Sequence, residues 1–171
     1  MAVTSSMVAR LATNQTGTNV FGTSRDERAM RAALELANGT GANQADRVYV
    51  AQRTVSSGAN DDIDIAGVLA DGFGTTITMA EVVGVFVINA AQDGTANTTN
   101  LTIGNATNAF EGFLSSSGTI GPIPPGGFVM IGASGAAGLG TVTAGSTDEL
   151  RVANSAGAAA TYQIGIIGRS A

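Results

Sequence analysis

The pattern of apolar and polar residues divides the chain into three parts. The first 23 residues mix small, polar and scattered apolar side chains without a helical or strand period. The apolar residues in this part are more numerous than a solvated tail needs: Met7, Val8, Leu11, Val20 and Phe21. We therefore expect either a disordered terminus or an extended arm that becomes ordered on a neighbouring subunit.

A single helix is predicted for residues 24–38. Ser24 and Glu27 form a capping box, in which the serine hydroxyl accepts from the Glu27 amide and the glutamate reaches back to Ser24. Apolar residues then recur at the i, i+3, i+4, i+7 spacing of one narrow helical face: Met30, Ala33, Leu34 and Ala37. Gly39 is well placed to end this helix.

From residue 47 onward the pattern becomes that of β-strands. Val48, Val50 and Val55 alternate with polar residues, and residues 81–89 are as dense in valine and isoleucine as a strand covered on both faces. Turn signals separate about seven to nine such segments. These signals lie at residues 71–72, 93–94, 122–127, 145–146 and 156–157.

These patterns predict a mainly β protein with two parts. Residues 1–44 are expected to form an extended N-terminal arm and one short helix at about 24–38. Residues 45–171 are expected to form an antiparallel β-sandwich or jelly-roll domain.

The composition of the 171 residues excludes many kinds of active site. The chain contains no histidine, cysteine or tryptophan, and all eight of its basic residues are arginines. Zinc sites built on thiolate or imidazole, Ser-His-Asp triads, cysteine nucleophiles and Schiff-base lysines are therefore excluded. We expect a protein that is not an enzyme and that uses no metal or other cofactor.

The net charge of −5 argues against general binding to nucleic acid or to an anionic membrane. The charge is unevenly distributed, because residues 1–57 carry six arginines and four acids whereas residues 58–171 carry two arginines and nine acids. Such asymmetry suggests that the two parts face different surroundings. No apolar run approaches the roughly 20 residues that a membrane span needs, and the N-terminus lacks the pattern of a secretory signal.

Acidic residues offer the remaining candidate chemistry. Asp61, Asp62 and Asp64 are the densest cluster and provide oxygen ligands of the kind that Ca²⁺ binds, but the EF-hand spacing is absent. A solvated strand entry is the preferred interpretation. Asp148 and Glu149 are neighbours that a strand would direct to opposite faces, which makes them a poor catalytic pair.

Two further segments are assigned structural roles. Residues 132–140 are rich in glycine but lack the ending of a phosphate-binding loop, so a flexible loop between strands is expected. The prolines at 122, 124 and 125, with the glycines after them, favour a stiff corner before a strand over a PxxP ligand.

The arginines give the N-terminal part its basic character. They lie at Arg10, Arg25, Arg28, Arg31, Arg47 and Arg53. Two interpretations stay open: a solvated face with local ion pairs, or a docking surface on which guanidinium groups grip carboxylates of an acidic partner. The candidate contact residues for a capsid or a neighbouring subunit are Arg10, Leu11, Val20, Phe21, Arg25, Arg28 and Arg31.

Several segments of the β region together resemble small virion proteins of tailed bacteriophages that decorate or cement the capsid. These segments are residues 45–48 (ADRV), 62–68 (DIDIAGV), 71–78 (DGFGTTIT), 82–89 (VVGVFVIN), 108–110 (NAF), 125–127 (PGG), 141–148 (TVTAGSTD) and 162–168 (YQIGIIG). The resemblance covers about residues 45–168.

The resemblance implies a non-enzymatic structural protein that binds the outside of the major capsid protein lattice and stabilises the phage head. It further implies a homodimer or homotrimer, synthesised in the cytoplasm of the host bacterium and located on the capsid surface of the virion. The expected partners are thus the major capsid protein and other copies of the chain, without nucleic acid or membrane.

Two alternatives belong to other functional classes. A tail- or fibre-associated module that recognises host carbohydrate would need exposed aromatic residues, of which this chain has few. A hydrolase that uses only carboxylates would need two acids facing one cleft, for which Glu81, Glu111 and Glu149 are the candidates.

Overall fold

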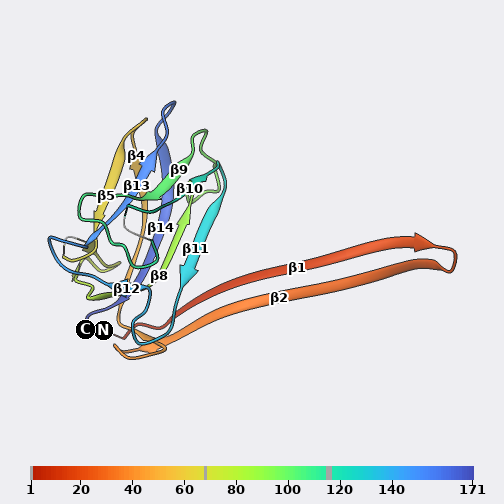
Figure 1. Ribbon diagram of the computed structural model, residues 1–171, viewed down its shortest axis with the longest axis horizontal. Helices are drawn as coiled ribbons and strands as arrows, with labels where there is room; N and C mark the ends of the chain where they lie inside the picture. The colour runs from red at the N-terminus through yellow and green to blue at the C-terminus, as the bar shows by residue number, and fades with distance from the viewer. Residues whose placement is uncertain (1, 68, 115–116) are drawn as a thin grey trace.

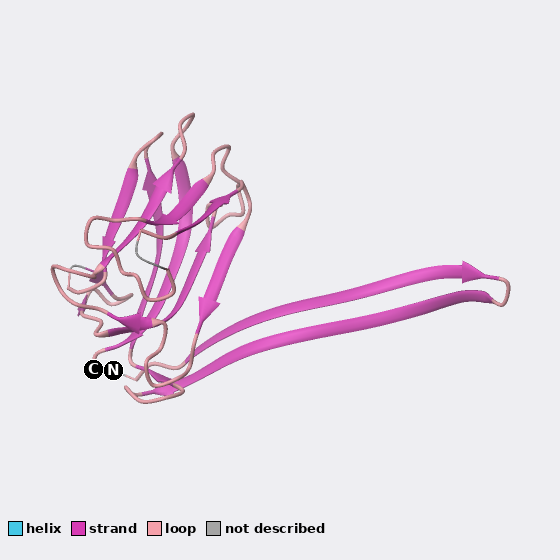
Figure 2. Ribbon diagram, viewed as in Figure 1, coloured by secondary structure: helices cyan, strands magenta, loops and turns pink. Residues whose placement is uncertain are grey.

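The computed structural model describes residues 2–67, 69–114 and 117–171. Met1, in the predicted arm, and Val68, in one of the segments that carry the resemblance, lie outside the described residues. Within the described ranges the chain forms fourteen β-strands and no helix (Figure 2). The prediction of a mainly β protein with antiparallel sheets is therefore confirmed.

Two sheets build the body, which we define as residues 44–171 (Figure 1). One sheet has the order β4 (Arg47–Val55), β14 (Ala160–Arg169), β8 (Glu81–Ile88), β11 (Phe128–Gly132), with β12 (Gly140–Thr141) also paired to β8. The other has the order β5 (Asn60–Asp64), β13 (Glu149–Asn154), β9 (Leu101–Gly104), β10 (Thr119–Ile123). A short ribbon of β6 (Leu69–Ala70) and β7 (Thr76–Ile77) accompanies them.

Side chains from both sheets share one hydrophobic core. Ile164 and Ile166 on β14 alternate with half-buried residues and point into the same cluster as Ile103 on β9 and Val152 on β13. This alternation is what a strand with one buried face requires. The predicted strand at residues 81–89 is covered on both faces at Val83, because Leu36 packs against it from outside the core.

One strand of the body was not predicted. β10 contains Pro122 within the segment that the sequence assigned to a corner, and its pairing with β9 shifts register between Ile120 and Ile123. A proline has no amide proton to donate, so it is tolerated at an irregularity of an edge strand, and β10 is the edge of its sheet.

The N-terminal part is a long β-hairpin, which we call the arm (residues 5–38). β1 (Ser5–Asn19) pairs antiparallel with β2 (Gly22–Asn38) along its whole length, and the hairpin projects far from the body (Figure 1). An extended arm was one of the two predicted possibilities for the first 23 residues. Fifteen residues in extended conformation correspond to about 50 Å.

The predicted helix at residues 24–38 is wrong, because this segment is β2. Ser24 pairs with Gly17 and donates its hydroxyl to the Gly17 carbonyl instead of capping a helix. Met30, Ala32, Leu34 and Leu36 in the same segment also follow an i, i+2 pattern, and pairing with β1 satisfies the backbone of the whole segment. An isolated short helix is marginal in water, so a ladder with a long partner strand overrides local helical propensity.

Contacts at its base fix the arm to the body. Met7 lies so close to Gly84 on β8 that a β-carbon there would clash with the methionine sulfur. A β-carbon on Gly132 of β11 would lie 3.1 Å from Leu34 Cδ2. Two glycines of the body sheet thus provide the room in which the arm base packs.

A buried arginine of the last strand joins β8, a loop and residue 44, which follows the arm. The Arg169 side chain is 0% exposed, and all five of its guanidinium donors have acceptors. The acceptors are Gln44 O, Ser134 O, Gly135 O, Ala136 O and Glu81 Oε2. Gln44 belongs to β3 (Gln44–Ala45), which pairs in parallel with the end of β2. The glycine-rich loop lies between β11 and β12 as predicted, and Arg169 holds its backbone.

Candidate docking arm

All seven predicted contact residues lie on the arm. In an antiparallel hairpin, residues that pair directly share one face, so the register assigns each side chain to a face. Arg10, Arg25 and Arg31 share one face, which we call the arginine face. Leu11 and Arg28 lie on the opposite face, and Val20 and Phe21 form the turn at the tip.

The arginine face carries a small excess of positive charge, because the register places Glu27 and Glu35 on it together with the three arginines. Arg10 and Arg31 are direct cross-strand partners, and like charges directly opposite each other destabilise a hairpin. Arg31 has one distant ion pair, with Glu35 at 3.8 Å. Among the described residues no carboxylate lies within 4.0 Å of Arg10. Carboxylates of a partner would relieve this repulsion, and arginine can bind them through two hydrogen bonds at once.

The other arginines of the arm have local partners. Arg25 forms an ion pair with Glu27 on its own strand and donates to Asn14 Oδ1 across the hairpin at 3.0 Å. Arg28 donates to Asp26 at 2.9 Å. All of these side chains are more than half exposed, so the ion pairs contribute at most about 1 kcal/mol each. The predicted solvated face with local ion pairs is therefore found at Arg25 and Arg28. The docking surface stays a prediction.

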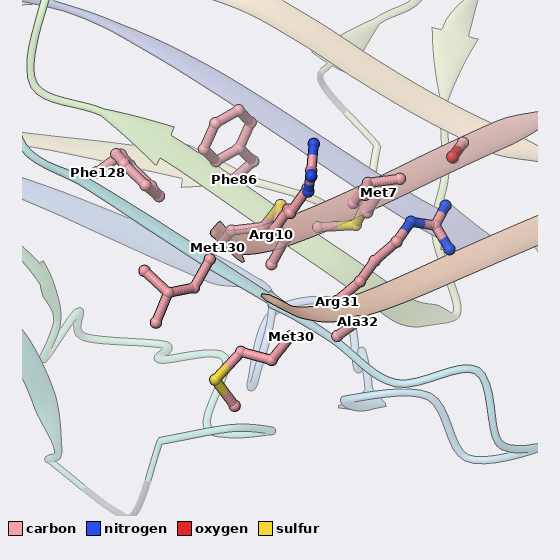
Figure 3. A pocket seen from close by; sticks show the side chains of 12 residues that line it. Met7, Arg10, Met30, Arg31, Ala32, Phe86, Phe128 and Met130 are labelled. Atoms are coloured by element: carbon pink, nitrogen blue, oxygen red, sulfur yellow. The ribbon is translucent and has the colours of Figure 1, made fainter. Parts of the chain in front are cut away.

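The opposite face of the arm is apolar near the body. Met7 pairs with Leu34, and Leu11 pairs with Met30. This face turns toward the outer surface of the sheet that contains β8 and β11. Between them lies a cavity of about 720 Å³ (Figure 3), which we call the wedge cavity.

Apolar side chains from both elements dominate the wedge cavity. Its main lining residues are Met7, Leu11, Met30, Phe86, Phe128 and Met130 (Figure 3), with Arg10 and Arg31 also at the cavity. The rings of Phe86 and Phe128 meet edge to face, with centroids 6.0 Å apart. Three of these residues, Arg10, Leu11 and Arg31, are among the contacts predicted from the sequence. The missed signal is the i, i+2 spacing of apolar residues in both arm strands.

The tip of the arm is apolar and fully exposed. Val20 is 97% and Phe21 99% exposed. The turn is closed by polar atoms, because the Phe21 amide donates to Asn19 Oδ1 at 2.9 Å. Gly22 supplies the positive φ of 116°.

The acidic cluster of β5 is held in ion pairs. Asp61 accepts two hydrogen bonds from Arg53, at 2.6 and 2.7 Å, and one from the Tyr162 hydroxyl at 2.8 Å. Burial alone would raise the pKa of Asp61, but these hydrogen bonds outweigh it and hold the pKa below its ordinary value. Asp62 accepts two from Arg151, at 2.6 and 2.8 Å. The cluster does lie on a strand, but its Asp61 carboxylate is largely removed from solvent.

The other acids also have structural partners. The Glu81 carboxylate accepts from Arg169, Asp148 accepts from the Gly145 amide, and Glu149 accepts from the Asn108 amide. In the part of the chain that the structure describes, no group of three or more acidic side chains is placed to hold a metal ion. The same part contains no helix that is long and apolar enough to span a bilayer.

Comparisons with protein-family models, with curated proteins and with solved structures return no match to this chain.

Proposed function

We propose that this chain is a non-enzymatic virion protein that binds the outside of a phage major capsid protein lattice and cements the head. The observation that carries the proposal is the arm, because it extends far from a folded body and presents all seven predicted contact residues to the surroundings. The location on the capsid surface and synthesis in the host bacterial cytoplasm belong to the same proposal, which the resemblance of residues 45–168 supports.

The stability of the arm favours a binding role. A two-stranded hairpin without further packing is marginal in water, and beyond its base this one has solvent on both faces. Its edges present unpaired backbone groups, which proteins normally cover or pair. A segment of this kind gains stability when it lies on a partner surface, and the arginine face suits an acidic one.

The strand order supports the finer description of the body as a jelly-roll β-sandwich. Within the described residues, the body has eight strands of four residues or more. Numbered in chain order from β4 to β14, they follow the order 1-8-3-6 in one sheet and 2-7-4-5 in the other. Such alternation between two sheets is that of two nested Greek keys, a fold used for many binding and capsid proteins.

The chemistry of the body favours a structural over an enzymatic role. Of the three acids that a carboxylate hydrolase would use, Glu81 accepts a hydrogen bond from Arg169 and Glu149 accepts one from the Asn108 amide, whereas Glu111 is exposed. Both tyrosines are buried, at 7% and 0% exposure, so neither offers a ring on which a sugar could stack. The host-recognition alternative would therefore depend on exposed phenylalanines such as Phe73.

The proposal is tested by co-sedimentation of the purified protein with capsid shells that lack it. We expect saturable binding at a fixed ratio to the major capsid protein, and the ratio identifies the symmetry site. The double variant Arg10→Gln/Arg31→Gln should weaken binding, whereas Arg47→Gln, on the body, should not. Absence of saturable binding by the wild-type chain would refute the cement role and direct attention to host carbohydrate.

A variant with a shortened arm provides a second, independent test. Removing residues 1–23 alone would leave β2 unpaired, so residues 12–29 are replaced by Asn-Gly to join the paired residues Leu11 and Met30. This dipeptide favours the type I′ turn of a two-residue hairpin loop. The body should stay folded while attachment to the shells is lost. Unchanged attachment would show that the arm is not the docking element.

A further inference from the structure

The tip of the arm and the wedge cavity match each other chemically but lie at opposite ends of the arm. The tip presents two exposed apolar side chains, Val20 and Phe21. The wedge cavity, at the base, is lined by exposed apolar groups that include Met30 at 68% and Phe128 at 66% exposure. About 30 Å of paired strand separates Leu11 at the cavity from Val20 at the tip, so a single chain cannot place its own tip in its own cavity (Figure 1).

Turn chemistry does not explain the residues at the tip. Two-residue hairpin loops favour asparagine and glycine, because these residues tolerate positive φ. The positive φ at this turn falls on Gly22, and neither Val20 nor Phe21 has one. Their apolar side chains contribute nothing to closing the turn, and full exposure of a phenylalanine ring forgoes the free energy that its burial would supply. Burial against another molecule accounts for their presence.

We propose that the arm tip of one copy of this chain binds in the wedge cavity of a second copy. The Phe21 ring would pack against Phe86 and Phe128 of that copy, where edge-to-face aromatic contacts are available. The fit brings no unpaired charge into the apolar cavity, because residues 15–24 contain no charged side chain.

Charge complementarity favours a second copy as the occupant. The arm, residues 5–38, carries four arginines and three acids, whereas the body, residues 44–171, carries four arginines and ten acids. The net charges are +1 and −6, so an arm that lies along the body of another copy makes opposite-charge contacts there.

The exchange can be reciprocal. In a two-fold pair the two arms run antiparallel, so that each tip reaches the base of the other arm and one set of contacts is made twice. Because every contact is made twice, such a pair buries twice the apolar surface of a single tip-in-cavity contact. It goes beyond the proposed capsid attachment, which uses carboxylates on the arginine face and can succeed or fail separately.

The mass of the full-length protein in solution tests this inference. Size-exclusion chromatography with light scattering, over a dilution series, should give a particle of two or more chains. The variant Phe21→Ser should shift the mass to that of one chain, whereas Phe73→Ser, which changes an 83% exposed phenylalanine outside the cavity, should not. A monomeric wild-type protein, or a Phe21→Ser variant with unchanged mass, would overturn the proposal.

Disulfide trapping tests the contact itself, because the natural chain has no cysteine. Under mild oxidation V20C/M130C, which keeps the Phe21 ring, should form covalent dimers in greater yield than V20C, M130C or V20C/F73C. Equal yields from all four variants would refute the tip-in-cavity contact. The Arg25→Gln variant, on the arginine face but outside the cavity, is measured in parallel: loss of capsid binding with retained self-association separates failure of one proposal from failure of the other.

Discussion

Replacement of Arg169 tests how strongly one buried side chain stabilises the part of the body next to the arm. Its side chain is 0% exposed, and its five donors bind a carboxylate and four backbone carbonyls. Replacement by methionine keeps an unbranched apolar chain in the site but removes every donor. The Glu81 carboxylate and the four carbonyls would then lose this partner together.

The size of the effect follows from this environment. Breaking a buried ion pair by removing one partner typically costs about 3–5 kcal/mol. The Glu81 side chain keeps 20% exposure, so water can solvate part of the orphaned charge, and we expect a loss of about 3 kcal/mol in the free energy of unfolding. At about 2–4 °C per kcal/mol for a chain of this size, the melting temperature should fall by about 6–12 °C.

Urea denaturation of Arg169→Met, compared with the wild type, measures this loss. Adding Glu81→Gln should recover roughly 1 kcal/mol, because the orphaned charge is then absent. Arg151→Met serves as the control, since its ion pair with Asp62 is partly exposed and should contribute at most about 1 kcal/mol. A loss below about 1 kcal/mol for Arg169→Met would refute the argument that this buried arginine holds β3, β8 and the loop at residues 134–136 together.

Three further predictions concern pH, packing and dynamics. The lowered pKa of Asp61 means that its contribution to stability is present above the ordinary aspartate pKa and is lost as pH falls toward the lowered value; Asp61→Asn should flatten that part of an acid-unfolding curve, and an unchanged curve would contradict the assignment. Gly168→Ala should lower the free energy of unfolding by about 1–3 kcal/mol, because its β-carbon would lie 2.5 Å from the Glu81 backbone oxygen, whereas Gly165→Ala, where a β-carbon meets only an ordinary contact at 3.9 Å, should cost less; thermal melts of the two variants measure the difference. Hydrogen exchange should be faster for backbone amides of the arm than for those of β14 in dilute protein, and self-association should slow it at the tip; a fast tip in the assembled protein would be evidence against the proposed interface.

Local sequence pattern was sufficient for most of the body. Valine and isoleucine alternation with turn residues at regular spacing located β4 and β8, because a strand with one buried face must alternate whatever its partners are. The order of the strands in the two sheets came only with the tertiary structure. β10 stayed hidden because Pro122 disfavours a strand by every local rule, and the pairing that tolerates it lies elsewhere in the chain.

The arm shows where local reasoning stops. The sequence by itself predicted an extended arm as one possibility for the first 23 residues. It also gave seven candidate contact residues, all of which lie on the hairpin. The segment 24–38 satisfied helix and strand patterns at once, because Met30 and Leu34 belong to both periods. Only pairing with β1, a partner that the local period does not reveal, decided between them.

The tertiary structure also decided which candidate residues act together. Arg10 and Arg31 are 21 positions apart in sequence and become direct neighbours through the hairpin register. Leu11 meets Phe86 and Phe128 around one cavity because Gly84 and Gly132 let the arm base approach the sheet. Residue types and periodicity are properties of short segments, so they were enough to locate strands of the body such as β4 and β8. Register and the meeting of distant surfaces depend on the free energy of the whole chain, and they created the paired arginines and the wedge cavity.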